Sequence, residues 1–222
     1  MKAIDEIIAM EWEMFQKVNE GGPRASCQED KATFEGMRRG QFEAWTDSVL
    51  ELYRDDLKRA RNDGRNLVEE KYIRMMEHTS PEEYELLRER VPHVTERTYA
   101  LARAVSGKLM KQTEELFRQF PRVSGAGRPL HSEEDNCWAT SVETYQLGEL
   151  LTYSETTLEA LEKYVAGLER QGVSLARNIL ENSVGYYGYE NLEEAERCAA
   201  AREKEPVCHL TLEPGGCSCC KD

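Results

Sequence analysis

The residues most suited to chemistry lie where helical periodicity predicts a protein core. At about 100° per residue, the apolar stripe of the first predicted helix centres on Glu11, and the next predicted helix carries Arg38 and Gln41 in the middle of its apolar face. An isolated buried charge is too costly to persist, so Arg38 needs an acidic partner. Because Glu11 has the required charge and a compatible position, we expect a buried Glu11–Arg38 pair.

A second polar stripe runs along a later segment with a spacing of four residues. Tyr145, Glu149 and Tyr153 lie opposite a leucine-rich stripe, where an exposed helical face would more often carry Lys and Glu. Two phenols around a carboxylate indicate a half-buried face whose hydroxyl groups need partners. Glu149, Tyr145 and Tyr153 are therefore the candidate catalytic residues.

Together the two stripes predict one polar pocket. Its expected lining is Glu11, Arg38, Gln41, Tyr145, Glu149 and Tyr153. Arg38 would clamp a carboxylate or phosphate, and Glu149 would act as an acid or base if its pKa were raised. The alternative is a satisfied structural network that only specifies how the helices pack.

The helix predicted over 66–78 is rich in ligand-type side chains. Glu70, Arg74, Glu77 and His78 share one face of it. A solvated face with a Glu70–Arg74 ion pair explains this arrangement. In the alternative interpretation, Glu70 and Arg74 point into the same pocket and bind its ligand. A di-metal carboxylate bundle would need Glu-x-x-His pairs, and none occurs, although an all-carboxylate metal site stays open.

The last residues form a cysteine-rich segment. Its candidate metal ligands are Cys208, His209, Cys217, Cys219 and Cys220. Thiolates and an imidazole at short range suit zinc or another soft metal, although the spacing is not that of a zinc finger. A redox-sensitive tail without a resident metal is the alternative. Cys27 lies in a polar loop and could act as a nucleophile, but no His is linked to it in the sequence. We expect Cys137 and Cys198 to be packing residues.

Composition excludes several classes of function. The net charge of −13 over 222 residues disfavours nucleic acid and anionic membranes, whose binding depends on Lys and Arg. The start, MKAIDEIIAMEWEMF, lacks the basic residues and unbroken apolar run of a secretory signal, and no window is long and apolar enough to cross a membrane. We expect a cytoplasmic protein with reduced cysteines, whose partner is a small molecule or another protein.

The elements that must position these residues are helices. Helical periodicity predicts helices over 4–18, 31–62, 66–78, 81–91, 93–120, 140–170, 174–184 and 191–204, with a Gly- and Pro-containing loop over 121–136. The expected fold class is all-α. One irregular bundle of about seven or eight helices fills residues 1–205, and a short cysteine-rich irregular tail follows over 206–222.

Several short motifs resemble a bacterial family known as domain of unknown function four-one-two-five. They are Trp12-Glu13-Met14-Phe15, Arg24-Ala25-Ser26-Cys27-Gln28, Met37-Arg38 with Gln41-Phe42, Glu70-Lys71-Tyr72, and Gly148-Glu149-Leu150 with Thr152-Tyr153-Ser154. The resemblance spans roughly residues 1–200. It implies a cytosolic bacterial protein without an established activity, whose relatives are sometimes joined to a nucleotidyltransferase-like domain. The cysteine-rich tail departs from the pattern of the family.

Three functional hypotheses follow from these residues. The leading one is a binding domain that holds a small anionic molecule against the polar cluster. The second is an enzyme that uses Glu149, Tyr145 and Arg38 for acid–base chemistry, with or without a metal. The third is a protein–protein interaction module that serves a nucleotidyltransferase-like enzyme.

Overall fold

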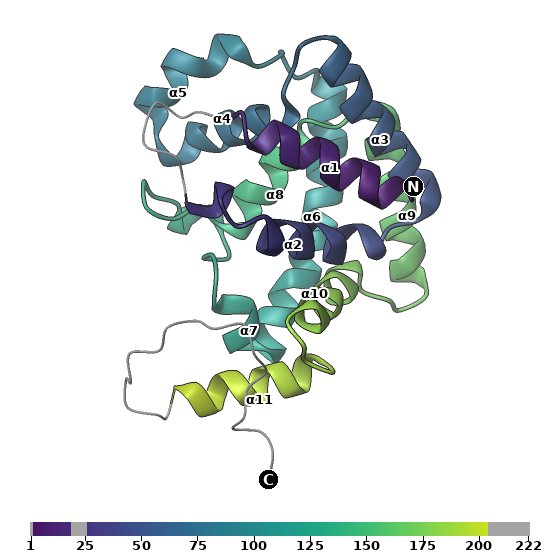
Figure 1. Cartoon of the computed structure of the whole chain (residues 1–222), viewed down its shortest axis with the longest axis vertical. Helices are drawn as coiled ribbons and strands as arrows, with labels where there is room; N and C mark the ends of the chain where they lie inside the picture. Colours follow the sequence, from purple (N-terminus) through teal and green to yellow (C-terminus); the bar gives the residue numbers. More distant parts are fainter. Residues whose placement is uncertain (1, 19–25, 204–222) are drawn as a thin grey trace.

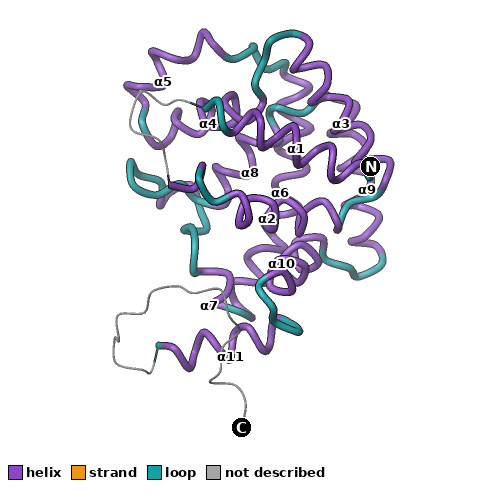
Figure 2. The backbone as a smooth tube through the Cα atoms, viewed as in Figure 1, coloured by secondary structure: helices purple, strands orange, loops and turns teal. Residues whose placement is uncertain are grey.

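The computed structural model describes residues 2–18 and 26–203, and the expected all-α class is confirmed there. No β-strand occurs in these ranges, which hold only one isolated bridge between Asn136 and Ala139 (Figure 2). The α-helices of this part are α1 (Ala3–Phe15), α2 (Lys31–Glu43), α3 (Asp47–Asn62), α4 (Leu67–Thr79), α5 (Pro81–Leu87), α6 (Glu96–Gln119), α7 (Pro121–Gly125), α8 (Val142–Leu150), α9 (Glu155–Arg170), α10 (Leu175–Tyr186) and α11 (Leu192–Arg202).

The prediction of a single helix over 31–62 is wrong, because this segment forms two helices, α2 and α3. The Thr46 hydroxyl caps α3 by accepting a hydrogen bond from the Val49 amide at 3.4 Å. The turn before it places Trp45 in the core, with its ring centroid 5.3 Å from that of Phe42 and 5.9 Å from that of Tyr53. The chain therefore changes direction between α2 and α3 at a turn whose Trp45 side chain is buried in the core.

The helix predicted over 140–170 also divides, into α8 and α9. Ser154 caps α9, and the buried Asp56 carboxylate accepts hydrogen bonds from the Ser154 amide at 3.0 Å and the Thr157 hydroxyl at 2.6 Å. A side chain of α3 thus stabilises the start of a helix that lies far away in sequence. These two breaks, together with α7, raise the number of helices from the eight predicted to eleven in the described residues.

The stretch 121–136 is not only a loop. Pro121 starts the short helix α7, where its missing amide hydrogen costs nothing, and the 3-10 helix η3 (Ser132–Glu134) follows. The chain then turns at Asn136–Ala139 before it enters α8. This segment places several polar side chains close to α8.

The described residues bury apolar side chains in two clusters. The larger one contains residues of α1, α2, α3, α4, α6, α8, α9 and α10, with Phe42, Leu57, Val105 and Leu158 fully buried. The smaller one lies where α7 and α11 meet beneath α10, at one end of the molecule (Figure 1). Helix α10 packs against both α2 and α11, so it joins the two clusters.

Two glycines bring α2 and α10 close together. A Cβ atom on Gly40 would lie 2.7 Å from the Ser183 hydroxyl and 3.2 Å from the Ser183 amide, and one on Gly36 would lie 2.2 Å from the Tyr186 ring. Such contacts are shorter than side chains tolerate, so the helices could not pack this closely with alanine at both positions.

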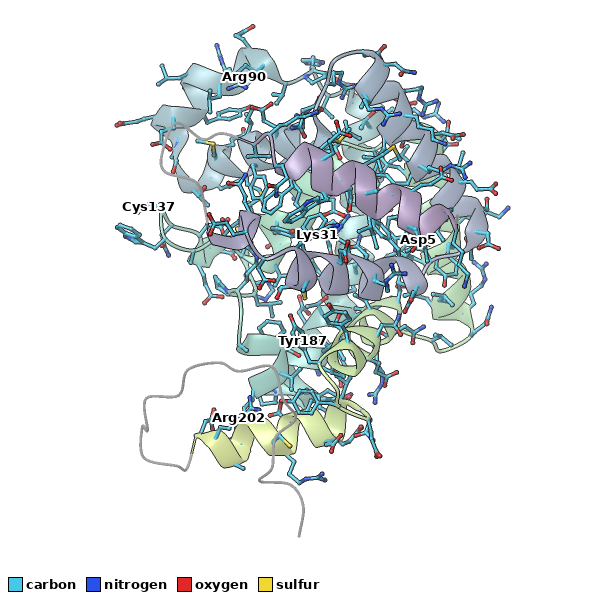
Figure 3. All side chains as sticks on the ribbon, in the orientation of Figure 1. Asp5, Lys31, Arg90, Cys137, Tyr187 and Arg202 are labelled. Atoms are coloured by element: carbon cyan, nitrogen blue, oxygen red, sulfur yellow. The ribbon has the colours of Figure 1, made fainter. Side chains whose placement is uncertain are left out.

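The cysteine predictions have mixed outcomes. Cys198 is buried as expected, whereas Cys137 is exposed at the edge of the molecule because it lies in the turn before α8 (Figure 3). Cys208, His209, Cys217, Cys219 and Cys220 lie outside the described residues, as does the whole tail 206–222. No helix within 2–18 and 26–203 has the length and apolar run needed to cross a bilayer.

Candidate functional site

The expected Glu11–Arg38 pair forms between α1 and α2. Arg38 donates from Nε to Glu11 Oε2 at 2.7 Å and from Nη2 to Glu11 Oε1 at 2.6 Å. The Tyr53 hydroxyl of α3 also donates to Glu11 Oε1, at 2.6 Å. Both charged side chains are buried, as the helical periodicity predicted. This bidentate pair therefore ties the first three helices together.

Arg38 also reaches the second predicted stripe. Its Nη1 donates to Glu149 Oε2 at 3.3 Å and to Gln41 Oε1 at 2.9 Å, and its Nη2 donates to Glu149 Oε1 at 3.1 Å. A guanidinium has five N–H groups, and the contacts to Glu11, Gln41 and Glu149 account for all five. An anion could bind Arg38 only by displacing one of these partners.

Glu149 is held by four side chains inside the bundle. Besides Arg38, it accepts hydrogen bonds from Lys71 Nζ at 2.5 Å, the Tyr153 hydroxyl at 2.7 Å and Gln41 Nε2 at 3.1 Å. Burial raises the pKa of Glu149, but the positive charges of Arg38 and Lys71 outweigh it and hold the pKa well below its ordinary value. The carboxyl group is therefore ionised and poorly suited to proton transfer near neutral pH.

The two buried tyrosines next to these carboxylates stay protonated. Burial and the neighbouring carboxylate raise the pKa of Tyr53, beside Glu11, and of Tyr153, beside Glu149, well above the ordinary value. Their ring centroids are 4.6 Å apart. Both phenols therefore act as hydrogen-bond donors to the buried acids.

Tyr145 contributes its ring rather than a hydrogen bond to Glu149. Lys71 Nζ lies 3.4 Å from the ring centroid, and Arg128 Cζ lies 4.4 Å from it. Arg128 comes from the segment before α8 and donates from Nη1 to the Thr140 carbonyl oxygen at 3.0 Å. Two cations thus meet on one aromatic side chain, an arrangement stabilised by the electron-rich face of the ring.

The side chains described so far are here called the charged cluster: Glu11, Arg38, Gln41, Tyr53, Lys71, Arg128, Tyr145, Glu149 and Tyr153. Two cavities lie next to it. The first, here called the cationic cavity, has a volume of about 450 Å³ and is lined by Lys71, Arg128 and the rings of Phe15, Phe34 and Tyr72. The second, the aliphatic cavity, has a volume of about 530 Å³ and is lined by leucine, isoleucine and valine side chains, most of them from α6 and α10, and by aromatic side chains that include Trp45 and Tyr153. Met37, Val142, Tyr145 and Glu149 line both cavities.

The predicted pocket residues divide between these cavities. Glu11 and Arg38 line the cationic cavity, whereas Gln41 and Tyr153 line the aliphatic one. The residues of the single pocket expected from the sequence are therefore divided between two cavities, which share Tyr145 and Glu149.

Glu70 and Arg74 do not join the cluster. Glu70 is buried and accepts two hydrogen bonds from Arg65, at 2.8 and 2.7 Å. Arg74 donates from Nη2 to the Pro92 carbonyl oxygen at 2.8 Å. Neither residue lines the cationic or the aliphatic cavity. The prediction of a solvated Glu70–Arg74 pair is wrong, because Arg65, in the turn before α4, is the partner of the carboxylate.

Three members of the cluster were not among the residues predicted for it. Lys71 shares the stripe of Val68 and Met75 on α4, so its position on an apolar face was a usable signal. Tyr53 follows Val49 by four residues on the buried face of α3. Arg128 lies outside any periodic segment, and only the folded path of the chain brings it to Tyr145.

Comparison with known proteins places the chain in a family without assigning it an activity. A family model described as "Protein of unknown function (DUF4125)" matches residues 1–197. No curated protein and no solved structure matches the chain. The match covers all the residues of the charged cluster and of the cationic cavity, and all those of the aliphatic cavity except Ala199.

Proposed function

Because the chain belongs to the DUF4125 family, whose description assigns no function, we propose one from the geometry: it binds a small anionic molecule in the cationic cavity. The observation that carries this proposal is the meeting of Lys71 and Arg128 at the Tyr145 ring in the wall of that cavity. A concave site with apolar walls and a few convergent polar groups is the usual form of a ligand site.

A cation with available hydrogen-bond donors in the wall of the cavity favours an anion. Glu11 and Glu149 are matched by Arg38 and Lys71, so Arg128 is an additional cation. Within the described residues, Arg128 makes a single hydrogen bond, from Nη1, which leaves other N–H groups for a ligand. Asp30 also lines the cavity, but it is exposed and accepts hydrogen bonds from Thr33 at the start of α2.

The apolar walls favour an anion that carries a ring. Phe15 and Phe34 are stacked with their centroids 5.3 Å apart, and Phe15 and Tyr72 are stacked at 6.1 Å. Flat aromatic surfaces gain dispersion and quadrupole interactions from another ring. We therefore infer that the ligand is a small aromatic or heterocyclic molecule with a carboxylate or phosphate group.

The enzyme hypothesis has less support. The depressed pKa of Glu149 and the raised pKa of Tyr153 both move these groups away from proton exchange near neutral pH. An interaction module would instead act through the surface, and it predicts a co-purifying protein rather than a small ligand.

The proposal is tested with a thermal-shift screen of aromatic carboxylates and heterocyclic phosphates, followed by titration calorimetry of any compound that raises the Tm. Arg128→Gln should weaken binding about tenfold, equivalent to about 1.4 kcal/mol for one lost charged contact. The matched control is Arg122→Gln, which removes the same charge from a side chain that lines only the aliphatic cavity. The proposal fails if no anion binds, or if both variants bind as well as the unaltered protein does.

A further inference from the structure

A cluster of metal-ligating side chains lies outside the charged cluster, where the chain enters α8. His131 directly precedes η3, Glu133 lies within η3, and Glu143 is in the first turn of α8. Their ligand atoms all lie within 4.8 Å of one another. His131 Nδ1 is 3.9 Å from Glu143 Oε2, and its Nε2 is 4.0 Å from Glu114 Oε1 of α6.

These separations fit ligands of a shared ion better than they fit direct contacts. A nitrogen–oxygen hydrogen bond spans about 2.7–3.2 Å, so the imidazole is too far from either carboxylate for one. Metal bonds to imidazole nitrogen and carboxylate oxygen are about 2.0–2.2 Å long, so two ligands of one ion lie at most about 4.4 Å apart. Rotations of the exposed Glu133 and of the half-exposed His131 and Glu143 side chains would bring all three onto a single ion.

The charge of the cluster is not balanced by the protein. Among the described residues, no Lys or Arg forms an ion pair with Glu114, Glu133 or Glu143. Acids elsewhere on the surface behave differently, since Glu162 on α9 pairs with Lys108 at 2.6 Å. Carboxylates that gather around an imidazole repel one another, and a divalent cation would offset that repulsion.

Backbone hydrogen bonds position the ligands. The Val142 amide donates to the Pro129 carbonyl oxygen at 2.8 Å, and the Glu143 amide donates to the Leu130 carbonyl oxygen at 3.2 Å. The Ser132 amide donates to Glu143 Oε2 at 3.1 Å, which orients this carboxylate toward His131. The segment therefore returns to the start of α8 with its ligands already adjacent.

We propose that His131, Glu133 and Glu143 bind one divalent transition-metal ion, with Glu114 as a positioning residue. A ligating histidine usually donates its second ring N–H to a carboxylate, and Glu114 stands next to the ring nitrogen that faces away from Glu143. One nitrogen and several oxygens suit Zn²⁺, Mn²⁺ or Fe²⁺, whereas Mg²⁺ and Ca²⁺ prefer oxygen alone. Three protein ligands leave a coordination position for water or substrate.

The test uses the full chain, stripped of metal, and Mn²⁺ as the probe. Thiolates favour softer metals, so the cysteines of the tail compete little for Mn²⁺. Calorimetry and electron paramagnetic resonance should show one bound Mn²⁺ per chain. His131→Ala and Glu143→Gln should each weaken binding at least tenfold, and Glu114→Gln by a smaller factor through loss of ring orientation.

Matched controls separate this site from adventitious binding. His78→Ala and Glu77→Gln alter an exposed histidine and an exposed glutamate of α4, and both should bind Mn²⁺ as the unaltered protein does. The proposal is overturned if Mn²⁺ does not saturate one site, or if His131→Ala and Glu143→Gln retain full affinity. Circular dichroism checks that each variant folds, and Glu133→Gln replaces either one that does not, with the same expected loss.

Discussion

The two cavities next to Glu149 differ in charge although they share part of their walls. Arg38, Lys71 and Arg128 line the cationic cavity, whereas Arg122 is the one cation among the described residues that line the aliphatic cavity, and aromatic rings line both. The same carboxylate lines both, so the difference comes from the residues around it.

The two arginines of the charged cluster have different roles in this arrangement. Arg38, with its five N–H groups occupied, joins helices from distant parts of the chain. Arg128 donates a single hydrogen bond within the described residues and lines the cationic cavity. Ligand recognition is therefore expected from the cation with spare donors, and architecture from the saturated one. Four predictions test this division, beginning with the largest expected effect.

Replacement of Arg38 should affect stability more than any other change in the cluster. Arg38→Met would leave Glu11 and Glu149 with one buried cation between them, and losing one member of such a network typically costs about 3–5 kcal/mol. Urea unfolding followed by circular dichroism measures the loss. Arg39→Met, which breaks a surface pair with Asp5, should leave the urea midpoint nearly unchanged, because solvent screens such a pair. A stable Arg38→Met variant that merely loses anion binding would make Arg38 a ligand clamp.

Acid should weaken the fold through Glu149. Its pKa is depressed in the folded state, so its stabilisation is fully present above the ordinary carboxyl range near pH 4.5 and is lost as the pH falls below it. The urea midpoint should therefore stay level between pH 7 and pH 5 and drop in more acidic buffer. Glu149→Gln should be less stable at pH 7 and show a shallower drop. Parallel profiles for the two proteins would contradict this assignment.

The aromatic ring of Tyr145, rather than its hydroxyl group, should contribute to stability and to ligand binding. Tyr145→Leu removes the ring from beside Lys71 and Arg128, at a cost of about 1–2 kcal/mol for two cation–π contacts, and should also weaken binding of the anionic ligand. Tyr145→Phe keeps the ring and should behave like the unaltered protein in both assays. Equal losses in the two variants would assign the role to the hydroxyl group instead.

Filling the aliphatic cavity should have the smallest effect. Ala199 of α11 lines only that cavity, and Ala199→Leu adds apolar volume there. We expect a gain of at most about 1 kcal/mol in unfolding free energy, with the Kd of the anionic ligand unchanged. Thermal unfolding and calorimetry measure both quantities. If the Kd rises in Ala199→Leu, the two cavities hold one ligand between them.

Part of this arrangement could be predicted from the sequence. Helix wheels identified Glu11, Arg38 and Glu149, because a charged residue on an apolar stripe is unusual. Tyr153 reaches Glu149 from the turn after α8 and not, as predicted, from one continuous helical stripe. The breaks before Thr46 and Ser154 were missed because apolar periodicity continues across both. Asp56 could be assigned to the start of α9 only once α3 and α9 were seen to pack. Arg128 depends likewise on tertiary structure, since no local pattern marks it.

The long sequence separation within the charged cluster has a consequence for how the protein is made. Glu149 lies 78 residues after Lys71 and 111 after Arg38, so it leaves the ribosome well after both cations. A nascent chain that ends before α8 holds Arg38 and Lys71 with Glu11 as their only acid from the cluster, and cannot bury them cheaply. We expect the N-terminal helices to stay loosely packed during translation and to consolidate when α8 docks.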